Sequence, residues 1–235
     1  MKYSIVIPCY NESENLMDLV NVINSFPSDY DVEFILVENG STDNSKQIFD
    51  NEIVENNLIK KVYVKENKGY GYGIIQGLKI ASGDYVGWLH ADLQYNPLDL
   101  KLYFDYINNH YNDRILLKGK RKNRKLVEYI FTFGMGIYDS ILFKKRMSNV
   151  MAMPVIFNKE LLNYIQLFPE DFSIDIFVYA LAQKKKYKVI HLPIYLKDRQ
   201  KGVSSWNVGF SSRIKQSIKM IKGSKQVKKV IKEVN

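Results

Sequence analysis

Cysteine is almost absent from the sequence: Cys9 is the single cysteine among 235 residues, and it lies in an apolar segment. One cysteine excludes a disulfide framework and a zinc site built on cysteines. It also makes a reducing compartment, the cytoplasm, the expected location. We expect Cys9 to pack in the core and not to act as a nucleophile.

The sequence shows neither a signal peptide nor an uninterrupted membrane-spanning run. Its start, MKYSIVIP, turns directly into a strand-like segment, whereas a signal peptide has basic, apolar and small-residue regions in that order. The longest apolar stretch, residues 126–143, is interrupted by Glu128 and Asp139 and falls short of the roughly 20 apolar residues that a spanning helix needs. We therefore expect no export, and a stretch that can lie on a membrane without crossing it.

Acidic residues are outnumbered, with 25 Asp and Glu against 34 Lys and Arg, which gives a net charge of +9. The basic residues gather at 118–125, 144–146, 184–186 and within 213–232. Such clusters favour a polyanion, either nucleic acid, nucleotide phosphates or an anionic bilayer, with solvated lysine faces as the alternative. Because no RNA-binding signature accompanies the aromatic residues near these clusters, we expect no nucleic-acid partner.

Short apolar runs alternate with amphipathic ones in the first half of the chain, and no repeat or low-complexity linker interrupts it. The expected strands are residues 3–8, 32–38, 60–66 and 84–92, and the expected helices are 12–26, 42–57, 72–83 and 97–111. In the less regular second half we expect strands at 115–121 and 188–196, a short extended piece at 151–158, and helices at 175–187 and 207–223. This order predicts an α/β fold, a mostly parallel sheet flanked by helices.

Polar residues and glycines follow four of the expected strands, at 8–12, 38–43, 66–73 and 90–94. Ligands of such sheets bind beyond the carboxyl ends of the strands, so these segments predict a binding site. The glycines in GYGYG, residues 69–73, would let an anion approach the start of a helix closely. The segment lacks the GKS or GKT of a Walker loop and fits GxGxxG poorly, so alone it is a weak signal.

The segment HADLQ places His90, Asp92 and Gln94 on alternate residues. If the extended path continues to Asn96, the three side chains point the same way. A nitrogen, a carboxylate and an amide oxygen could then hold Mg²⁺ or Mn²⁺ beside a phosphate. In the alternative interpretation His90 packs or caps, and Asp92 starts a turn.

Four motifs together resemble the family-2 glycosyltransferases of GT-A fold, in particular the branch of dolichol-phosphate mannose synthases and bacterial polyprenyl-phosphate sugar transferases. They are VIPCYNE at 6–12, VENGSTD at 37–43, ENKGYGYGI at 66–74 and HADLQ at 90–94. The later segments at 119–121, 148–157, 172–194 and 199–207 agree with this resemblance. It implies one GT-A domain over residues 1–207, with a nucleotide-binding half of about 1–97 and an acceptor half of about 98–207, followed by a basic helical tail at 208–235.

The resemblance implies a nucleotide-diphospho-sugar donor and a divalent metal, Mn²⁺ or Mg²⁺. The residues that it assigns to the donor are Pro8, Tyr10, Glu12, Glu38, Asn39, Asp43, Lys68, Gly69, Gly71, Ala91, Arg199 and Ser204. Glu38 and Asn39 stand where two aspartates are usual, which leaves UDP- and GDP-linked donors open. HADLQ resembles the DxD metal motif, so Asp92 is the expected main ligand and Gln94 an auxiliary one, while His90 is either a ligand or a contact to the donor.

The implied reaction is displacement at the anomeric carbon with inversion, assisted by the cation on Asp92 and by Arg199, for which a surface salt bridge is the alternative. Asp175 matches the catalytic aspartate, the general base for a hydroxyl acceptor. It would only orient groups if the acceptor is an ionised lipid phosphate, and it could instead cap its helix. Arg121 resembles the arginine that lies near phosphates in the polyprenyl-phosphate branch.

The expected acceptor is a polyprenyl phosphate or a lipid-linked glycan of cell-envelope synthesis. We expect a peripheral protein on the cytoplasmic face of an anionic membrane, and leave a homo-oligomer open. A sugar nucleotidyltransferase is an alternative class, but it would need a glycine-rich, basic loop after the first strand, and VIPCYNESEN at 6–15 has neither glycine nor lysine. A nucleotide-binding relative without catalysis is a further alternative, because His90 and Asn39 depart from the motifs.

Overall fold

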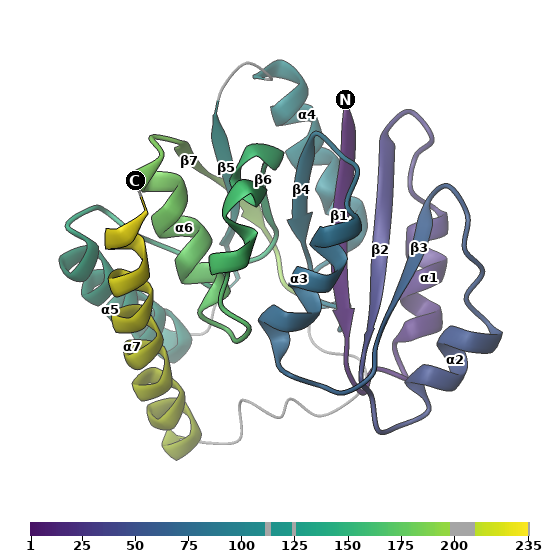
Figure 1. Ribbon diagram of the computed structural model, residues 1–235, viewed down its shortest axis with the longest axis horizontal. Coiled ribbons are helices and arrows are strands. Elements are labelled where there is room, and N and C mark those ends of the chain that lie inside the picture. The colour runs from purple at the N-terminus through teal and green to yellow at the C-terminus, as the bar shows by residue number, and fades with distance from the viewer. Residues whose placement is uncertain (111–113, 124–125, 198–209, 235) are drawn as a thin grey trace.

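Seven strands form one mixed sheet in the computed structural model, which describes residues 1–110, 114–123, 126–197 and 210–234 (Figure 1). The strands are β1 (Lys2–Cys9), β2 (Asp31–Asn39), β3 (Ile59–Val64), β4 (Tyr85–Trp88), β5 (Ile115–Arg121), β6 (Val155–Asn158) and β7 (Lys188–Ile194). Their order is β3-β2-β1-β4-β6-β5-β7. Only β6 runs antiparallel to its neighbours β4 and β5. The other six strands therefore end at one side of the sheet, which we call the carboxyl edge, and the predicted α/β fold is confirmed.

Helices cover both faces of this sheet. They are α1 (Leu16–Asn24), α2 (Ser45–Asn51), α3 (Tyr70–Ile80), α4 (Leu100–Asn109), α5 (Leu126–Phe143), α6 (Ile174–Lys184) and α7 (Phe210–Glu233), with 3-10 segments at Pro97–Asp99 and Lys159–Leu167. Figure 1 shows α3 and α6 on the near face, α4 on the far face, and α5 beside α7 at the β7 end. Helix α7 contacts both α5 and α6, and its Val227 and Ile231, with Val234 directly after it, are buried with the main core.

Most helix boundaries differ from those expected by a few residues, and two differ most. Helix α2 ends at Asn51 instead of residue 57, because the Asn56 side chain accepts hydrogen bonds from the backbone of Leu58 and Ile59 and turns the chain into β3. Helix α7 runs past Gly223 to Glu233. A Cβ at Gly223 would lie 3.0 Å from Cβ of Ser173, so this glycine permits close helix packing instead of ending the helix.

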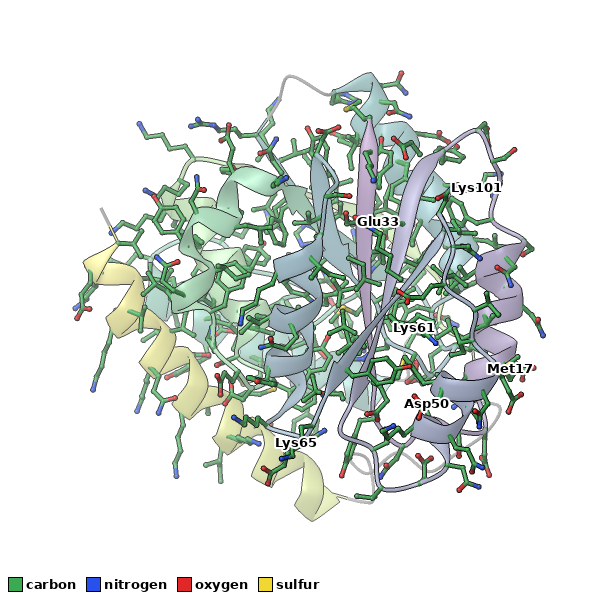
Figure 2. The ribbon with its side chains drawn as sticks, turned by 45° about the vertical axis from the view of Figure 1, so that its right-hand side comes forward. Met17, Glu33, Asp50, Lys61, Lys65 and Lys101 are labelled. Carbon is green, nitrogen blue, oxygen red and sulfur yellow. The ribbon has the colours of Figure 1, made fainter. Side chains whose placement is uncertain are left out.

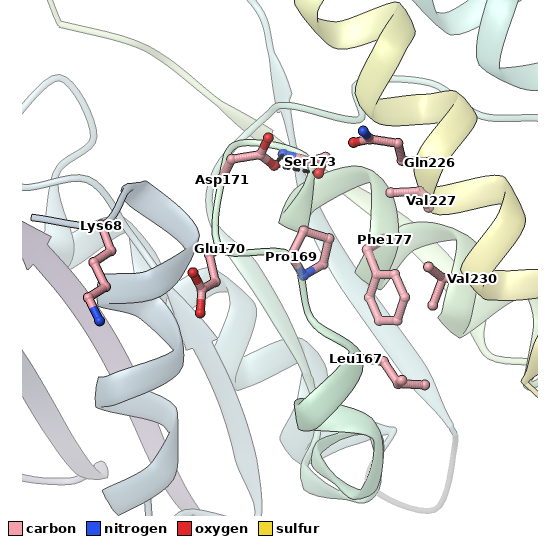
Figure 3. A pocket seen from close by; sticks show the side chains of 10 residues that line it. All are labelled: Lys68, Leu167, Pro169, Glu170, Asp171, Ser173, Phe177, Gln226, Val227 and Val230. Atoms are coloured by element: carbon pink, nitrogen blue, oxygen red, sulfur yellow. Dashed lines mark hydrogen bonds between the residues drawn. The ribbon is translucent and has the colours of Figure 1, made fainter.

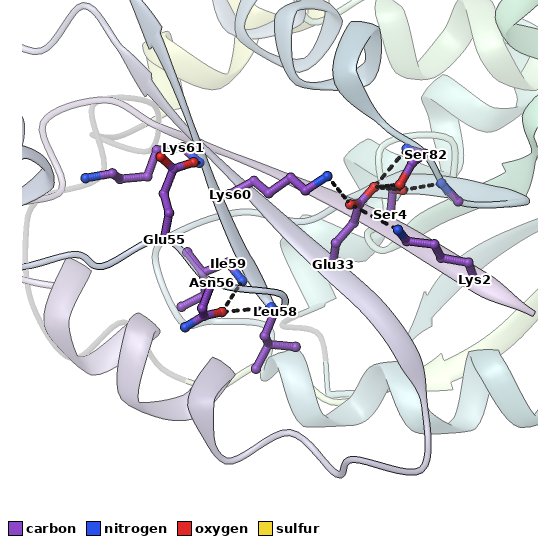
Figure 4. Close-up of polar contacts among 11 residues, drawn as sticks. Lys2, Ser4, Glu33, Glu55, Asn56, Leu58, Ile59, Lys60, Lys61 and Ser82 are labelled. Atoms are coloured by element: carbon purple, nitrogen blue, oxygen red, sulfur yellow. Dashed lines mark hydrogen bonds and ion pairs between the residues drawn. The ribbon is translucent and has the colours of Figure 1, made fainter.

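The core is continuous, and the carboxylate of Glu33 from β2 is fully buried in it (Figure 2). Its oxygens receive hydrogen bonds from Ser4 and Ser82 and lie 2.8 Å from Nζ of Lys60 and 3.7 Å from Nζ of Lys2 (Figure 4). Burial acts to raise the pKa of Glu33, but these partners outweigh it and lower the pKa to about 2. An ionised group thus ties β1, β2 and β3 together.

Cys9 is fully buried at the end of β1, and burial raises the pKa of its thiol well above the ordinary value. Its burial confirms the packing role that the sequence predicted. None of the described helices combines the length and the apolar character needed to cross a membrane.

Candidate active site

The loops that follow β1 and β2 are joined by hydrogen bonds at the carboxyl edge. Asn11, which adopts a left-handed backbone with φ of 56°, accepts a hydrogen bond at its Oδ1 from the backbone N–H of Thr42 over 2.8 Å. The Asp43 carboxylate accepts from the backbone of Ser13 and of Ser45. Burial acts to raise the pKa of Asp43, but these hydrogen bonds prevail and lower it. The two predicted loop segments therefore form one surface.

Glu38 is buried and shapes the turn after β2. Its carboxylate accepts hydrogen bonds from the backbone N–H of Ser41 over 2.7 Å and of Gly40 over 3.3 Å. Gly40 has a left-handed φ of 70°, and a Cβ there would lie 2.4 Å from the backbone nitrogen of Asn67. The turn therefore requires glycine at this position.

Asn39 bridges to the segment that opens α3. Its Nδ2 donates to the carbonyl oxygen of Gly69 over 3.2 Å, and its own carbonyl accepts from Nδ2 of Asn67 over 2.9 Å. Its Oδ1 is buried, and no hydrogen-bond donor among the described residues reaches it. Asn39 therefore presents an unused acceptor at the carboxyl edge.

The glycines that open α3 have a packing role that the sequence did not predict. A Cβ at Gly71 would lie 2.3 Å from the carbonyl oxygen of Pro169, and one at Gly69, where φ is 127°, would lie 2.7 Å from that of Glu170. The backbone N–H of Tyr72 donates to the same Glu170 carbonyl over 2.8 Å. These glycines let the start of α3 contact the segment before α6, and a contact between them and the donor stays a prediction.

A pocket of about 450 Å³ lies between the start of α3, the segment before α6 and helix α7 (Figure 3). Its lining residues are Lys68, Leu167, Pro169, Glu170, Asp171, Ser173, Phe177, Gln226, Val227 and Val230. In Figure 3, Lys68 and Glu170 stand at one side, and Phe177 of α6 lies on the side of Val227 and Val230 of α7. Lys68, predicted to bind the donor, therefore lies at the rim of this pocket, and its Nζ lies 5.2 Å from the centre of the Tyr72 ring.

The alternation predicted for His90, Asp92 and Gln94 is wrong. Strand β4 ends at Trp88, and Leu93 adopts a left-handed backbone with φ of 56°. The backbone N–H of Gln94 donates to Oδ1 of Asp92 over 3.2 Å, which forms a side-chain-stabilised turn. Asp92 therefore starts a turn, as in the alternative interpretation, and the extended path does not continue to Asn96.

Aromatic rings surround His90 at this turn. The centre of its ring lies 5.3 Å from that of Tyr70 and 6.1 Å from that of Tyr95. Asp92 is 8% exposed and Ala91 is buried. Within the part of the chain that the structure describes, no group of three or more His, Cys, Asp or Glu side chains is placed to hold a metal ion. A cation at this turn would have Asp92 as its carboxylate ligand, and its other ligands would come from His90, Gln94 or a substrate.

A cluster of polar side chains, all buried except the half-buried Arg121, lies beside this turn, and we call Trp88, Tyr95, Lys118, Arg121 and Asp175 the buried polar cluster. Nε1 of Trp88 donates to Oδ1 of Asp175 over 3.3 Å, and Nζ of Lys118 lies 3.8 Å from the same oxygen. Arg121 donates to the carbonyl of Met151, and its Cζ lies 5.5 Å from the centre of the Tyr95 ring. Four buried atoms of the cluster make no hydrogen bond with the described residues: Tyr95 Oη, Lys118 Nζ, Arg121 Nε and Asp175 Oδ2.

Burial shifts the pKa values of both members of the ion pair at the centre of the cluster, Asp175 and Lys118. It raises the pKa of Asp175 to about 6, although Lys118, the Trp88 N–H and Arg121 act in the opposite direction. It lowers the pKa of Lys118 to about 8, against the attraction of Asp175. Groups of this kind, buried and strongly shifted, are concentrated at functional sites.

The structure places most of the predicted site residues on the carboxyl edge or directly beside it. They are Pro8, Tyr10, Glu12, Glu38, Asn39, Asp43, Lys68, Gly69, Gly71, His90, Ala91, Asp92, Gln94, Arg121 and Asp175. Arg199 and Ser204 lie outside the described residues. The sequence prediction missed Trp88, Tyr95 and Lys118. Lys118 could have been noticed in the sequence, because it directly follows the apolar residues of the strand ILLKGKR, and a lysine is unexpected in the interior of a sheet.

The fold places this chain among α/β proteins of the GT-A class. Glucosyl-3-phosphoglycerate synthase of Mycobacterium tuberculosis, solved with Mn²⁺, UDP-glucose and phosphoglyceric acid, gives a TM-score of 0.71 at 15% identity over 97% of this chain and 80% of that one. TarS of S. aureus, residues 1–349, gives 0.58 at 22% identity over 95% and 65%. At these identities the likeness shows the fold alone.

This chain belongs to glycosyl transferase family 2, whose model matches residues 4–163. It is 27% identical over 210 residues to the dolichol-phosphate mannosyltransferase of Pyrococcus furiosus, and this match covers 87% of this chain and 59% of that protein. It is 37% identical over 102 residues to the undecaprenyl-phosphate 4-deoxy-4-formamido-L-arabinose transferase of Proteus mirabilis, over 42% of this chain and 31% of the relative. The family predicted from the motifs is thus confirmed, and the chain spans less than two thirds of either relative.

Proposed function

We propose that this chain is an inverting glycosyltransferase that moves a sugar from a nucleotide-diphospho-sugar to a polyprenyl phosphate in cell-envelope glycan synthesis. The observation that carries the proposal is the buried polar cluster, in which Nζ of Lys118 and Nε of Arg121 are buried donor atoms that make no hydrogen bond with the described residues. Tyr95 connects this cluster to the turn of His90 and Asp92. Lys118 pairs with Asp175, so Arg121 is the cation that suits an anionic acceptor, and the two relatives are named for dolichol and undecaprenyl phosphates.

The donor nucleotide would lie along the loops after β1 and β2. Asn39 supports this placement, because its unused Oδ1 can accept a hydrogen bond from a base N–H. Uracil and guanine both carry a ring N–H, so UDP- and GDP-linked sugars are the two donor classes to test. Arg199 and Ser204 would complete the contacts to the diphosphate from outside the described residues.

A divalent cation, Mn²⁺ or Mg²⁺, would be held by Asp92, with Gln94 and His90 as further ligands. One carboxylate fits this role, because Mg²⁺ sites often combine one or two carboxylates with substrate phosphates, and an imidazole nitrogen favours Mn²⁺. When bound, the cation would neutralise charge that develops on the departing nucleoside diphosphate. His90 would bind the cation from its position between the Tyr70 and Tyr95 rings.

The acceptor phosphate would lie against Arg121. An oxygen of this phosphate forms the new bond to the anomeric carbon while the bond from that carbon to the donor diphosphate breaks, which inverts the configuration and releases the nucleoside diphosphate. The phosphate is already ionised, so no proton has to be removed. Arg121 would orient the nucleophile and reduce its repulsion from the donor.

The exposed side of α5 supports a membrane-held acceptor. Tyr129, Ile130, Phe133, Ile137 and Ile141 are each between 47% and 74% exposed, and we call them the α5 apolar face. The basic residues at 144–146 follow directly. An apolar helix face with cationic residues at its end can bind the headgroup region of an anionic bilayer. We infer peripheral contact with the cytoplasmic face of a membrane.

A hydroxyl acceptor, such as the sugar of a lipid-linked glycan, is the second candidate. Asp175 favours it, because its Oδ2 has no hydrogen-bond partner among the described residues and its pKa is raised to about 6. A carboxylate with these properties could take the proton of a sugar hydroxyl as general base. The two candidates share the donor and differ only in the acceptor.

Transfer assays with three acceptors test the proposal. The purified chain is incubated with radiolabelled UDP- and GDP-hexoses, Mn²⁺ and either undecaprenyl phosphate, undecaprenol or a soluble saccharide. We expect labelled lipid only with the phosphate, and loss of this product in Arg121→Gln but not in Lys122→Gln, whose lysine is exposed on the adjacent residue. Label in the saccharide would favour the second candidate. Binding of the nucleotide without transfer to any acceptor would favour a non-catalytic relative.

A further inference from the structure

Lys118 is a lysine that the fold buries completely. Its side chain is 0% exposed, and its Nζ makes no hydrogen bond with any described residue. Neighbouring residues of β5, among them Leu116 and Leu117, are buried apolar residues. Burial of an ammonium group without hydrogen bonds costs free energy. A methionine would fill the same place in the strand at lower cost, so packing does not account for a lysine here.

The opposite charge closest to Lys118 is the Asp175 carboxylate, 3.8 Å from its Nζ. This distance is too long for a hydrogen bond, so the interaction is mainly coulombic. Trp88 donates to the same oxygen, Oδ1. One oxygen of Asp175 is therefore held by groups from β4 and β5, and Oδ2 is left without a partner among the described residues.

We propose that Lys118 is a positioning residue, whose buried ammonium keeps the Asp175 carboxylate ionised and fixed against Trp88 beside the transfer site. This inference rests on the proposed function, because that function assigns Asp175 to the site. Lys118 acts through Asp175 and touches neither donor nor acceptor. Arg121, three residues further along the same strand, is then left to pair with the substrate.

The charged groups around the pair support this role. Lys118 and Arg121 from β5 stabilise the carboxylate, Trp88 from β4 donates to it, and the Tyr70 hydroxyl from α3 faces it as a neutral group whose pKa is raised by burial and by Asp175. Without Lys118, Arg121 would be the one cation left to oppose the effect of burial, among the groups that the structure describes. Asp175 would then take up a proton at a higher pH.

The first test measures Asp175 directly in the free protein. Aspartate carboxyl carbons are labelled with ¹³C, the signal of Asp175 is assigned by its loss in Asp175→Asn, and the signal is followed by NMR against pH. We expect the Asp175 signal of the wild type to have its midpoint near pH 6. In Lys118→Met the proton affinity of Asp175 should be at least tenfold higher, so that the midpoint lies at higher pH. In Lys118→Arg the midpoint should be close to that of the wild type. An unchanged midpoint in Lys118→Met would overturn the proposal. Lys118→Gln replaces Lys118→Met if the latter does not fold.

The second test separates positioning from a merely structural role. If the acceptor is a hydroxyl, for which Asp175 acts as base, we expect the acid limb of the pH–rate profile in Lys118→Met to move upward with the Asp175 midpoint, and Lys118→Arg to restore it. In an Asp175→Asn background, Lys118→Met should change kcat less than twofold, because its target is absent. A uniform loss of rate with an unmoved profile would instead show that Lys118 only supports the fold.

The two tests distinguish failure of this inference from failure of the proposed function. The NMR titration needs no donor and no acceptor. If the wild type transfers no sugar but the Asp175 midpoint still rises in Lys118→Met, the proposed function is wrong and the ion-pair role of Lys118 stands. If the wild type transfers sugar and the midpoint does not move, the function stands and the role of Lys118 is wrong.

Discussion

The ammonium of Lys118 and the carboxylate of Asp175 face each other 3.8 Å apart in the interior, one on β5 and the other on α6. Their strand and helix are adjacent because α6 packs on β5 and β7. Removing one partner of such a pair leaves a buried charge unpaired, which generally destabilises a fold more than the pair itself stabilises it. The fold therefore retains both charges at a cost, next to the edge where donor and acceptor are proposed to meet.

Asp92 is predicted to carry the metal-dependent part of donor binding. In a thermal-shift assay with UDP and GDP, with and without Mn²⁺, we expect one diphosphate to stabilise the wild type, and Asp92→Ala to lose the part that needs Mn²⁺. At a ligand concentration about 100 times its Kd that stabilisation is about 2.7 kcal/mol, or about 5–10 °C in Tm. Asp29→Ala is the matched control, because Asp29 precedes β2 at the opposite edge. A full Mn²⁺ response in Asp92→Ala would remove the assigned ion site.

Glu33 is predicted to stabilise the sheet in a pH-dependent way. Its folded pKa of about 2 lies below the ordinary value of 4.5, so its contribution is fully present above about pH 4.5 and is lost as the pH falls toward 2. In urea unfolding at pH 7, Glu33→Ala should lower the free energy of unfolding by about 2–3 kcal/mol, because hydrogen bonds to a charged group are removed.

The same Glu33 measurement at pH 3 should show a smaller difference between variant and wild type. Glu52→Ala is the control, since Glu52 is an exposed carboxylate at the end of α2. It should change the free energy of unfolding by less than about 0.5 kcal/mol at either pH. A Glu33→Ala effect that is equal at pH 7 and pH 3 would show that packing, and not the ionised carboxylate, is responsible.

Periodicity predicted the sheet well, because the first four strands are short apolar runs that the alternation with helices separates clearly. It failed at His90, Asp92 and Gln94, where the turn depends on a left-handed Leu93 and on a hydrogen bond to Asp92. Neither of these is visible in an alternation of polar and apolar residues.

Lys118 shows a second limit of sequence reading. Its residue type is unusual for a buried strand, but only the fold brings it to Asp175 on a distant helix. The glycines at 69 and 71 show the same limit, because the backbone at 169–171 that they contact comes from another part of the chain. The motifs, in contrast, lie at strand ends, and the topology of a parallel sheet is enough to predict that they gather.

The α5 apolar face is predicted to bind anionic bilayers. Burying an isoleucine side chain is worth about 1.5–3 kcal/mol, so Ile141→Glu should weaken binding to phosphatidylglycerol vesicles by about tenfold or more in a flotation assay. Val54→Glu is the matched control, because Ile141 and Val54 are both 74% exposed and Val54 lies far from α5 in the sequence. Equal loss in both variants, or binding that neither variant changes, would contradict a role for this face.

Asp175→Asn is predicted to separate the two candidate acceptors. If a hydroxyl is the acceptor, Asp175 is the base, and kcat/KM should fall by about 10²–10⁴. The wild-type rate should then also fall below about pH 6, where the carboxylate is protonated. Asp139→Asn is a closely matched control: Asp139 is buried on α5, accepts a hydrogen bond from Ser224 of α7, and has a pKa that burial raises to about 6. If a polyprenyl phosphate is the acceptor, Asp175→Asn should cost less than about tenfold, because an ionised phosphate needs no base. A large loss with the phosphate acceptor would show that Asp175 contributes more to the transfer than the proposed mechanism assigns to it.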